Sequence, residues 1–83
     1  MPETRKIIMY GTTWCGASRR ARQFFDENNI EYEWIDIDKD REAGKLVEKI
    51  NGGFRSVPTI VFPDDSTLTE PSTYQLRAKF NLG

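Results

Sequence analysis

The fold is decided by the stretch Tyr10-Gly11-Thr12-Thr13-Trp14-Cys15-Gly16-Ala17-Ser18. This stretch joins an apolar run to a helical pattern and holds the only cysteine. Before it, Lys6-Ile7-Ile8-Met9-Tyr10 is too short for a helix and rich in strand-forming residues, which predicts a buried strand. After it, residues 16–28 carry apolar side chains at helical spacing, which predicts an amphipathic helix. We therefore expect Cys15 at the N-terminal end of that helix.

The rest of the chain alternates between strand and helix patterns. Further strands are expected at residues 32–37, 59–62 and 67–70, and further helices at 42–50 and after Ser72. Two early strand–helix units require a parallel pair of strands, whereas the turn at 63–66 makes the last two strands antiparallel. The sequence predicts one α/β domain over residues 1–83, of order βαβαββα, with a four-stranded mixed sheet flanked by three helices.

Composition excludes several classes of partner. The 83 residues include 12 Lys and Arg against 13 Asp and Glu, so the chain lacks the basic surface of a nucleic-acid-binding protein. One cysteine cannot form an internal disulfide, and Met1-Pro2-Glu3-Thr4-Arg5-Lys6 leads into an apolar run too short for a signal sequence or membrane span. We expect a cytoplasmic protein with no nucleic-acid or membrane partner.

The sequence contains no histidine, which excludes histidine general bases, cysteine–histidine dyads and histidine-rich metal sites. Activation of Cys15 must therefore come from the helix N-terminus, nearby cations or hydrogen bonds. Arg19, Arg20 and Arg22 follow the cysteine, and they either lower the thiol pKa or form a solvated helix face. A buried, inert cysteine is the alternative that composition alone favours.

Three separated segments carry a family resemblance. They are Thr12-Thr13-Trp14-Cys15-Gly16, Asn51-Gly52-Gly53-Phe54-Arg55-Ser56-Val57-Pro58-Thr59 and Leu68-Thr69-Glu70-Pro71-Ser72. In this order they resemble the glutaredoxin family of the thioredoxin fold, and most closely its short mycoredoxin-type members. The resemblance spans nearly the whole chain and implies a thioredoxin-like, glutaredoxin fold and a monomer that acts on oxidised proteins.

The resemblance also implies residue roles. Cys15 would be the nucleophilic thiolate, Val57 would offer its backbone groups to a thiol substrate, and Pro58 would be a cis-proline beside the sulfur. The expected substrate-binding set is completed by Thr13, Trp14, Arg55 and Ser72, and no metal ligand is expected. Trp14 fits simple rim packing equally well, and Ser72 fits a helix cap.

Ser18 departs from the family pattern. Dithiol members carry a second cysteine there, three residues after the nucleophile. The Ser18 hydroxyl either hydrogen-bonds the thiolate of Cys15 or is an ordinary first-turn helix residue, and an engineered replacement of cysteine would leave the same serine. Thr69-Glu70-Pro71-Ser72 also stands where glutathione-using members carry a Gly-Gly…Asp stretch, which leaves the identity of the small thiol open.

A single cysteine predicts a monothiol mechanism. We expect a thiol–disulfide oxidoreductase that acts on mixed disulfides between proteins and a low-molecular-weight thiol, which can be mycothiol, glutathione or bacillithiol, with no tightly bound cofactor. Two other classes stay open. One is a monothiol glutaredoxin that carries a [2Fe–2S] cluster between two subunits, although Ala17 replaces the phenylalanine of that motif. The other is a redox-inactive thioredoxin-fold binding module.

Overall fold

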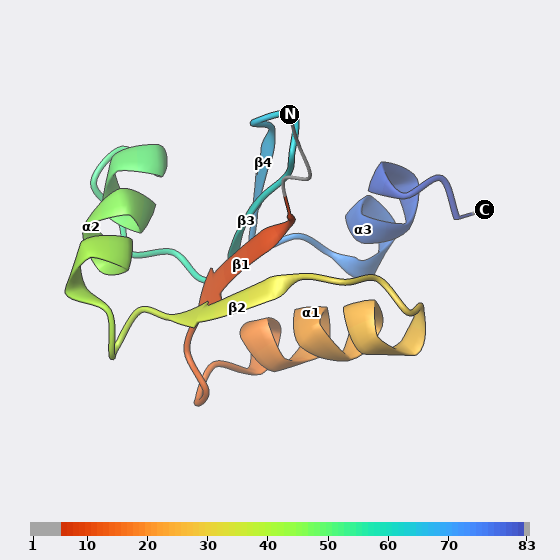
Figure 1. Ribbon diagram of the computed structural model, residues 1–83, viewed down its shortest axis with the longest axis horizontal. Coiled ribbons are helices and arrows are strands. Elements are labelled where there is room, and N and C mark those ends of the chain that lie inside the picture. Colours follow the sequence, from red (N-terminus) through yellow and green to blue (C-terminus); the bar gives the residue numbers. More distant parts are fainter. Residues whose placement is uncertain (1–5, 83) are drawn as a thin grey trace.

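The computed structural model describes residues 6–82, and its elements follow the predicted order (Figure 1). They are β1 (Ile8–Gly11), α1 (Gly16–Glu27), β2 (Glu33–Asp36), α2 (Arg41–Ile50), β3 (Thr59–Val61), β4 (Thr67–Thr69) and α3 (Thr73–Lys79). Each predicted boundary is confirmed to within two residues. The expectation about the opening segment concerns residues 1–5, which lie outside the described part. Among residues 6–82, every helix is too short or too polar to cross a membrane.

The sheet has the strand order β2-β1-β3-β4 and is mixed, as predicted. β1 pairs in parallel with β2, and it pairs in antiparallel with β3, where Tyr10 faces Thr59. β4 is antiparallel to β3, with Thr69 opposite Thr59. The ends of β1, β2 and β4 and the start of β3 therefore lie at one edge of the sheet. Four connecting segments converge there.

The two faces of the sheet are covered by different helices, with α2 on one side and α1 and α3 on the other (Figure 1). The alternation of side chains along β1 explains this division, because successive residues of a strand point to opposite faces. Met9 is fully buried among residues of α1 and α3, whereas Tyr10 packs with Val47 of α2. Tyr10 is thus a core residue.

The helix ends are fixed by local signals that the sequence contains. Asp40 caps α2 by accepting a hydrogen bond of 3.0 Å from the Ala43 N–H. Ser72 caps α3, because its hydroxyl accepts from the Gln75 N–H at 3.1 Å while the Gln75 side chain accepts from the Ser72 N–H. The predicted cap at Ser72 is confirmed.

Candidate functional site

Cys15 lies where the loop after β1 enters α1, at the edge of the sheet on which the four segments converge. It is the N-cap residue of α1, with extended backbone angles of φ −83° and ψ 121°, and its side chain forms no capping hydrogen bond in the thiol form. The thiol is partly buried, and Sγ lies 3.7 Å from the carbonyl oxygen of Val57, to which the thiol donates. The predicted placement of the cysteine is therefore confirmed.

Opposing effects act on the Cys15 pKa, and the net result is a lowered value. Partial burial is the largest single effect and raises the pKa of the thiol, but hydrogen bonding from the backbone and hydroxyl of Ser18 and from the backbone of Ala17 together outweighs it. The carboxylate of Glu70 raises the pKa slightly. Peptide N–H groups at a helix N-terminus stabilise a thiolate in this way. Cys15 is therefore more easily ionised than an ordinary cysteine.

Ser18 is fully buried beneath the cysteine, one turn into α1. Its hydroxyl oxygen accepts a hydrogen bond of 3.5 Å from the Thr12 N–H, and the same hydroxyl helps to lower the pKa of Cys15. Gly11 makes this arrangement possible, since a Cβ at that position would lie 2.7 Å from the Ser18 oxygen. The effect of the hydroxyl on the Cys15 pKa agrees with the hydrogen-bonding role expected of Ser18, which stays a prediction.

The arginines that follow the cysteine do not act as expected of activating cations. Arg22 turns toward β2, where its guanidinium lies 4.1 Å from the centre of the Trp34 ring and its Nε donates to the Tyr32 hydroxyl. Arg19 and Arg20 are exposed on the helix. The lowering of the Cys15 pKa comes instead from hydrogen bonds. Arg19 and Arg20 form the solvated face that was the alternative, whereas Arg22 packs against Trp34 and is half-buried.

The segment before β3 forms the opposite wall of the site. The Val57-Pro58 peptide bond is cis, as the resemblance implies, and Pro58 is buried. Sequence reasoning gave Asn51 no role of its own, yet its side chain donates to the Thr59 hydroxyl at 2.9 Å and accepts from the Thr69 hydroxyl at 2.7 Å. These contacts tie the end of α2 to β3 and β4 directly behind the wall.

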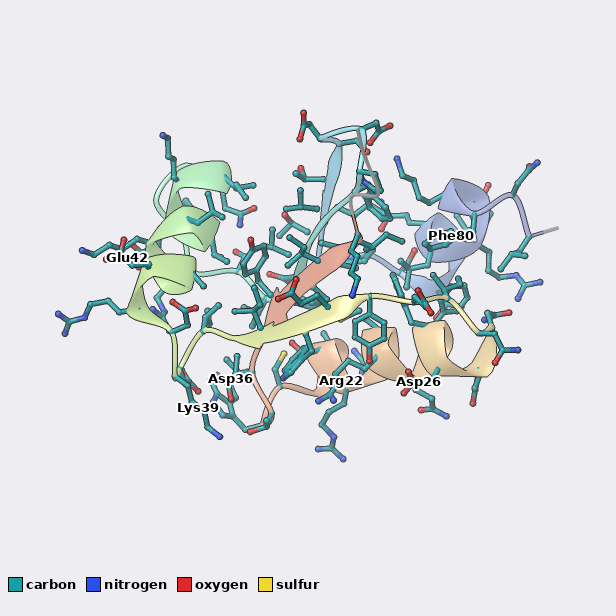
Figure 2. The ribbon with its side chains drawn as sticks, in the orientation of Figure 1. Arg22, Asp26, Asp36, Lys39, Glu42 and Phe80 are labelled. Carbon is teal, nitrogen blue, oxygen red and sulfur yellow. The ribbon has the colours of Figure 1, made fainter. Side chains whose placement is uncertain are left out.

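Asp38, at the rim of the site, is a second residue whose role sequence reasoning missed. The Trp14 side chain is 70% exposed, yet its Nε1–H donates to Asp38 Oδ2 at 2.8 Å. Asp38 Oδ1 lies 3.5 Å from Nη2 of Arg55, so one carboxylate contacts two of the predicted binding residues. Figure 2 shows Asp36 and Lys39, which flank Asp38, at the same edge as the loop that leads into α1. The sequence did contain a signal for Asp38. It follows β2, and because β1 and β2 are parallel, the loops after these two strands lie at the same edge of the sheet.

A groove of about 450 Å³ runs from the first turns of α1 to the start of α3. Its lining residues include Ala17, Arg20, Glu70, Ser72 and Gln75. The Ser72 hydroxyl is engaged in the helix cap, and Thr13 is exposed to solvent on the loop before the cysteine. The structure therefore links Trp14 and Arg55 through Asp38 and places the Val57 carbonyl against the sulfur. Ser72 lies in the groove together with Ala17.

The described surface also has a hollow away from the cysteine. A larger hollow of about 660 Å³ lies at the opposite end of β1, between Lys6 and the 25–32 segment, far from Cys15 in the topology. Within residues 6–82, no group of three or more acidic or cysteine side chains is arranged to hold a metal ion. The chemistry of the described chain is concentrated at Cys15.

Comparisons with known proteins agree with this geometry. The sequence profile of the glutaredoxin family matches residues 7–66. A Mycobacterium tuberculosis protein named as a candidate glutaredoxin is 42% identical over 76 residues, which cover 92% of this chain and 90% of that protein. Mycoredoxin 1 of Corynebacterium glutamicum is 37% identical over 73 residues, which cover 88% of this chain and 90% of that protein. A mutant thioredoxin-like protein matches in fold, with a TM-score of 0.80 at 24% identity over 96% of this chain and 100% of its own.

Proposed function

We propose, from the premise that this chain belongs to the glutaredoxin family, that it reduces mixed disulfides between proteins and a low-molecular-weight thiol by a monothiol mechanism. The proposal rests on the observed position and properties of Cys15. It is the only cysteine of the chain, it caps α1, its thiol pKa is lowered, and it is partly open to solvent. These are the properties of a reactive thiolate, because structural cysteines are buried in apolar surroundings that raise the pKa.

In the first step the Cys15 thiolate attacks the small-thiol sulfur of a protein–S–S–R mixed disulfide. A bond forms between Cys15 Sγ and that sulfur, the original S–S bond breaks, and the protein leaves as a thiolate that takes a proton from water. The departing protein is reduced, and Cys15 now carries the small thiol as Cys15–S–S–R. The hydrogen bonds that stabilised the Cys15 thiolate are released in this step.

In the second step an external small thiolate attacks the sulfur of R in Cys15–S–S–R. It forms the small disulfide, and the Cys15 thiolate leaves. The electron pair that reduced the protein thus comes from the small thiols, and the external thiol is consumed once per turnover. The hydrogen bonds from Ser18 and Ala17 favour Cys15 as the leaving group, because a thiol of lower pKa leaves faster.

The small thiol is expected to lie along the segment before β3. The Val57 carbonyl oxygen lies 3.7 Å from the sulfur. Arg55, two residues earlier in the same segment, supplies a cation that is paired with Asp38. Glu70, in the groove between α1 and α3, repels a carboxylate. Trp14 offers an exposed ring for the protein substrate. A reaction that needs a reduced small thiol operates in a reducing compartment, which suits the cytoplasm.

A turnover assay tests the proposal. The substrate is a cysteine peptide held in a mixed disulfide with glutathione, mycothiol or bacillithiol, each assayed with its own free thiol, and peptide thiol release is followed by chromatography. We expect Cys15→Ala to lower the rate to the uncatalysed background, a loss of at least about a hundredfold, because no other sulfur can form the intermediate.

A relocated cysteine provides the matched control. In Cys15→Ala/Ser66→Cys the single thiol stands on the turn between β3 and β4, away from the α1 N-terminus. We expect this variant to react no faster than a free cysteine peptide. Equal activity of the wild-type protein and Cys15→Ala would contradict the proposed function, and equal activity of the relocated thiol would contradict the role of the site around Cys15.

A further inference from the structure

We propose that Asp38 sets the charge preference of the site, because it occupies the Arg55 guanidinium and a carboxylate on the small thiol must compete with it. Asp38 is thus a positioning residue, which acts on the substrate through Arg55 and holds the Trp14 ring at the same time. The inference rests on the proposed function and deepens it, since it concerns which class of small thiol reacts fastest.

The two oxygens of the Asp38 carboxylate have separate partners. Oδ2 accepts the Trp14 Nε1–H at 2.8 Å, and Oδ1 faces Arg55 Nη2 at 3.5 Å. The side chains of Arg55 and Asp38 are 47% and 43% exposed, so the pair lies at the surface and a substrate can reach it. An ion pair this exposed contributes little to folding stability. Its main effect is expected on the binding of charged ligands.

Asp38 is held in place before any substrate arrives. Its N–H donates to the Asp36 side chain at 2.9 Å, and the Asp36 carbonyl accepts from the N–H groups of Lys39 and Asp40, each at 3.1 Å. This turn connects β2 to α2, and Figure 2 shows the Asp36 side chain within it. The turn therefore fixes the backbone of Asp38, and the hydrogen bond from Trp14 orients its carboxylate, so little further conformational entropy is lost when it pairs with Arg55.

Arg55 is confined on its other side by α2. Gly44 has no side chain, and a Cβ there would lie 2.8 Å from Arg55 Nη1, so the guanidinium occupies the space that the glycine leaves. Arg55 therefore lies between the first turns of α2 and the Asp38 carboxylate. It is a positioned cation whose charge is already compensated.

This arrangement predicts how the substitution Asp38→Asn changes selectivity. The amide oxygen of asparagine still accepts the Trp14 hydrogen bond, whereas the negative charge that compensates Arg55 is removed. We expect transfer of an anionic small thiol to Cys15 to become about three- to tenfold faster relative to a neutral one at low salt, the range that one partly exposed ion pair supports. The gain should shrink at high ionic strength.

The experiment uses three probes of different charge, made by joining one neutral cysteine peptide in mixed disulfides to mercaptopropionate, mercaptoethanol or cysteamine. The second-order rate constant for transfer of the small thiol to Cys15 is measured in a single turnover by mass spectrometry. The expected result is that Asp38→Asn raises the anionic-to-neutral ratio and lowers the cationic-to-neutral ratio. Asp38→Ala, which also loses the Trp14 contact, should show the same ratios with slower transfer of all three probes.

Two controls isolate the pathway through Arg55. Glu42→Gln removes an exposed charge from the first turn of α2 and should leave both ratios within about twofold of the wild-type values. In Arg55→Gln/Asp38→Asn the gain over Arg55→Gln alone should nearly vanish. A gain of the same size with and without Arg55, or ratios unchanged by Asp38→Asn, would overturn the inference. Each ratio is measured on a protein that reacts with the probes, so such a result leaves the proposed function intact. A wild-type protein that transfers none of the probes would refute that function.

Discussion

Ser18 is the residue on which the reactivity of Cys15 depends most directly, because its hydroxyl and backbone both help to lower the pKa of that thiol. Removing the hydroxyl should leave Ala17 and the Ser18 backbone in place and raise the Cys15 pKa toward its ordinary range. With Ser18→Ala we therefore expect exchange at neutral pH to slow by about three- to tenfold, because the lost hydrogen bond lowers the ionised fraction of the thiol while the higher pKa makes the remaining thiolate more nucleophilic. The measurement is the ultraviolet absorbance of the thiolate as a function of pH, together with the pH profile of exchange.

Because Ser18 lowers the pKa of Cys15, removing its hydroxyl changes how the rate of exchange depends on pH. Ser18→Ala should move the rising limb of the pH profile to higher pH, so that its rate approaches that of the wild-type protein under alkaline conditions, where both thiols are ionised. Ser66→Ala removes a hydroxyl from the turn after β3 and serves as the control, for which we expect no displacement of the profile. A parallel loss of rate at every pH would instead assign Ser18 a purely structural role.

At the scale of single residues, part of the site follows from sequence alone. The position of Cys15 at the start of a helix was predictable, because it depends only on where an apolar run ends and a helical pattern begins. The direction of Arg22 was not, since it depends on the ring of Trp34, which reaches the helix only in the folded chain. The same holds for the choice between the two expected roles of Ser18.

At the scale of elements, the junction between β1 and α1 depends on the absence of a side chain at Gly11. A Cβ there would lie 2.7 Å from the Ser18 oxygen and 2.8 Å from Cη2 of Trp34, both of which are confined. We expect Gly11→Ala to reduce the free energy of unfolding by about 1–3 kcal/mol through overpacking, measured by urea denaturation. It should also slow exchange, because Ser18 is displaced from Cys15.

Gly16 offers a matched comparison on the other side of the cysteine. The nearest atom to a Cβ at this position is the flexible end of Arg20 at 3.4 Å, and Gly16 is the first residue of α1. Gly16→Ala should therefore leave the free energy of unfolding unchanged or raise it by up to about 1 kcal/mol, because alanine favours the helix. Equal destabilisation by both substitutions would show that the contact with Ser18 and Trp34 is not the cause.

The element order was predictable because hydrophobic periodicity and turn residues mark each helix and strand locally. The contact between Trp14 and Asp38 was harder to predict, since it joins two loops that are 24 residues apart in the sequence. Only the parallel pairing of β1 and β2 brings those loops together. The role of Asn51 was missed for a similar reason, because its partners lie on β3 and β4.

At the scale of the whole molecule, the topology brings four segments to one edge of the sheet but supplies that edge with a single thiol. No second thiol of this chain can displace the small thiol from Cys15–S–S–R. Without added thiol, a large excess of a peptide mixed disulfide should therefore release about one equivalent of peptide thiol per protein and then stop. Rapid-quench chromatography measures this burst, and mass spectrometry should show one small thiol bound to Cys15.

The substitution Ser18→Cys changes this balance and completes the test. A thiol at position 18 can attack Cys15–S–S–R, form an internal disulfide and release the small thiol, so peptide thiol and small thiol should appear in equal amounts. The wild-type protein should release no free small thiol until an external thiol is added, after which its initial rate should rise in proportion to the thiol concentration. Release of small thiol by the wild-type protein alone would show that the domain completes the exchange without an external thiol, which contradicts the monothiol mechanism.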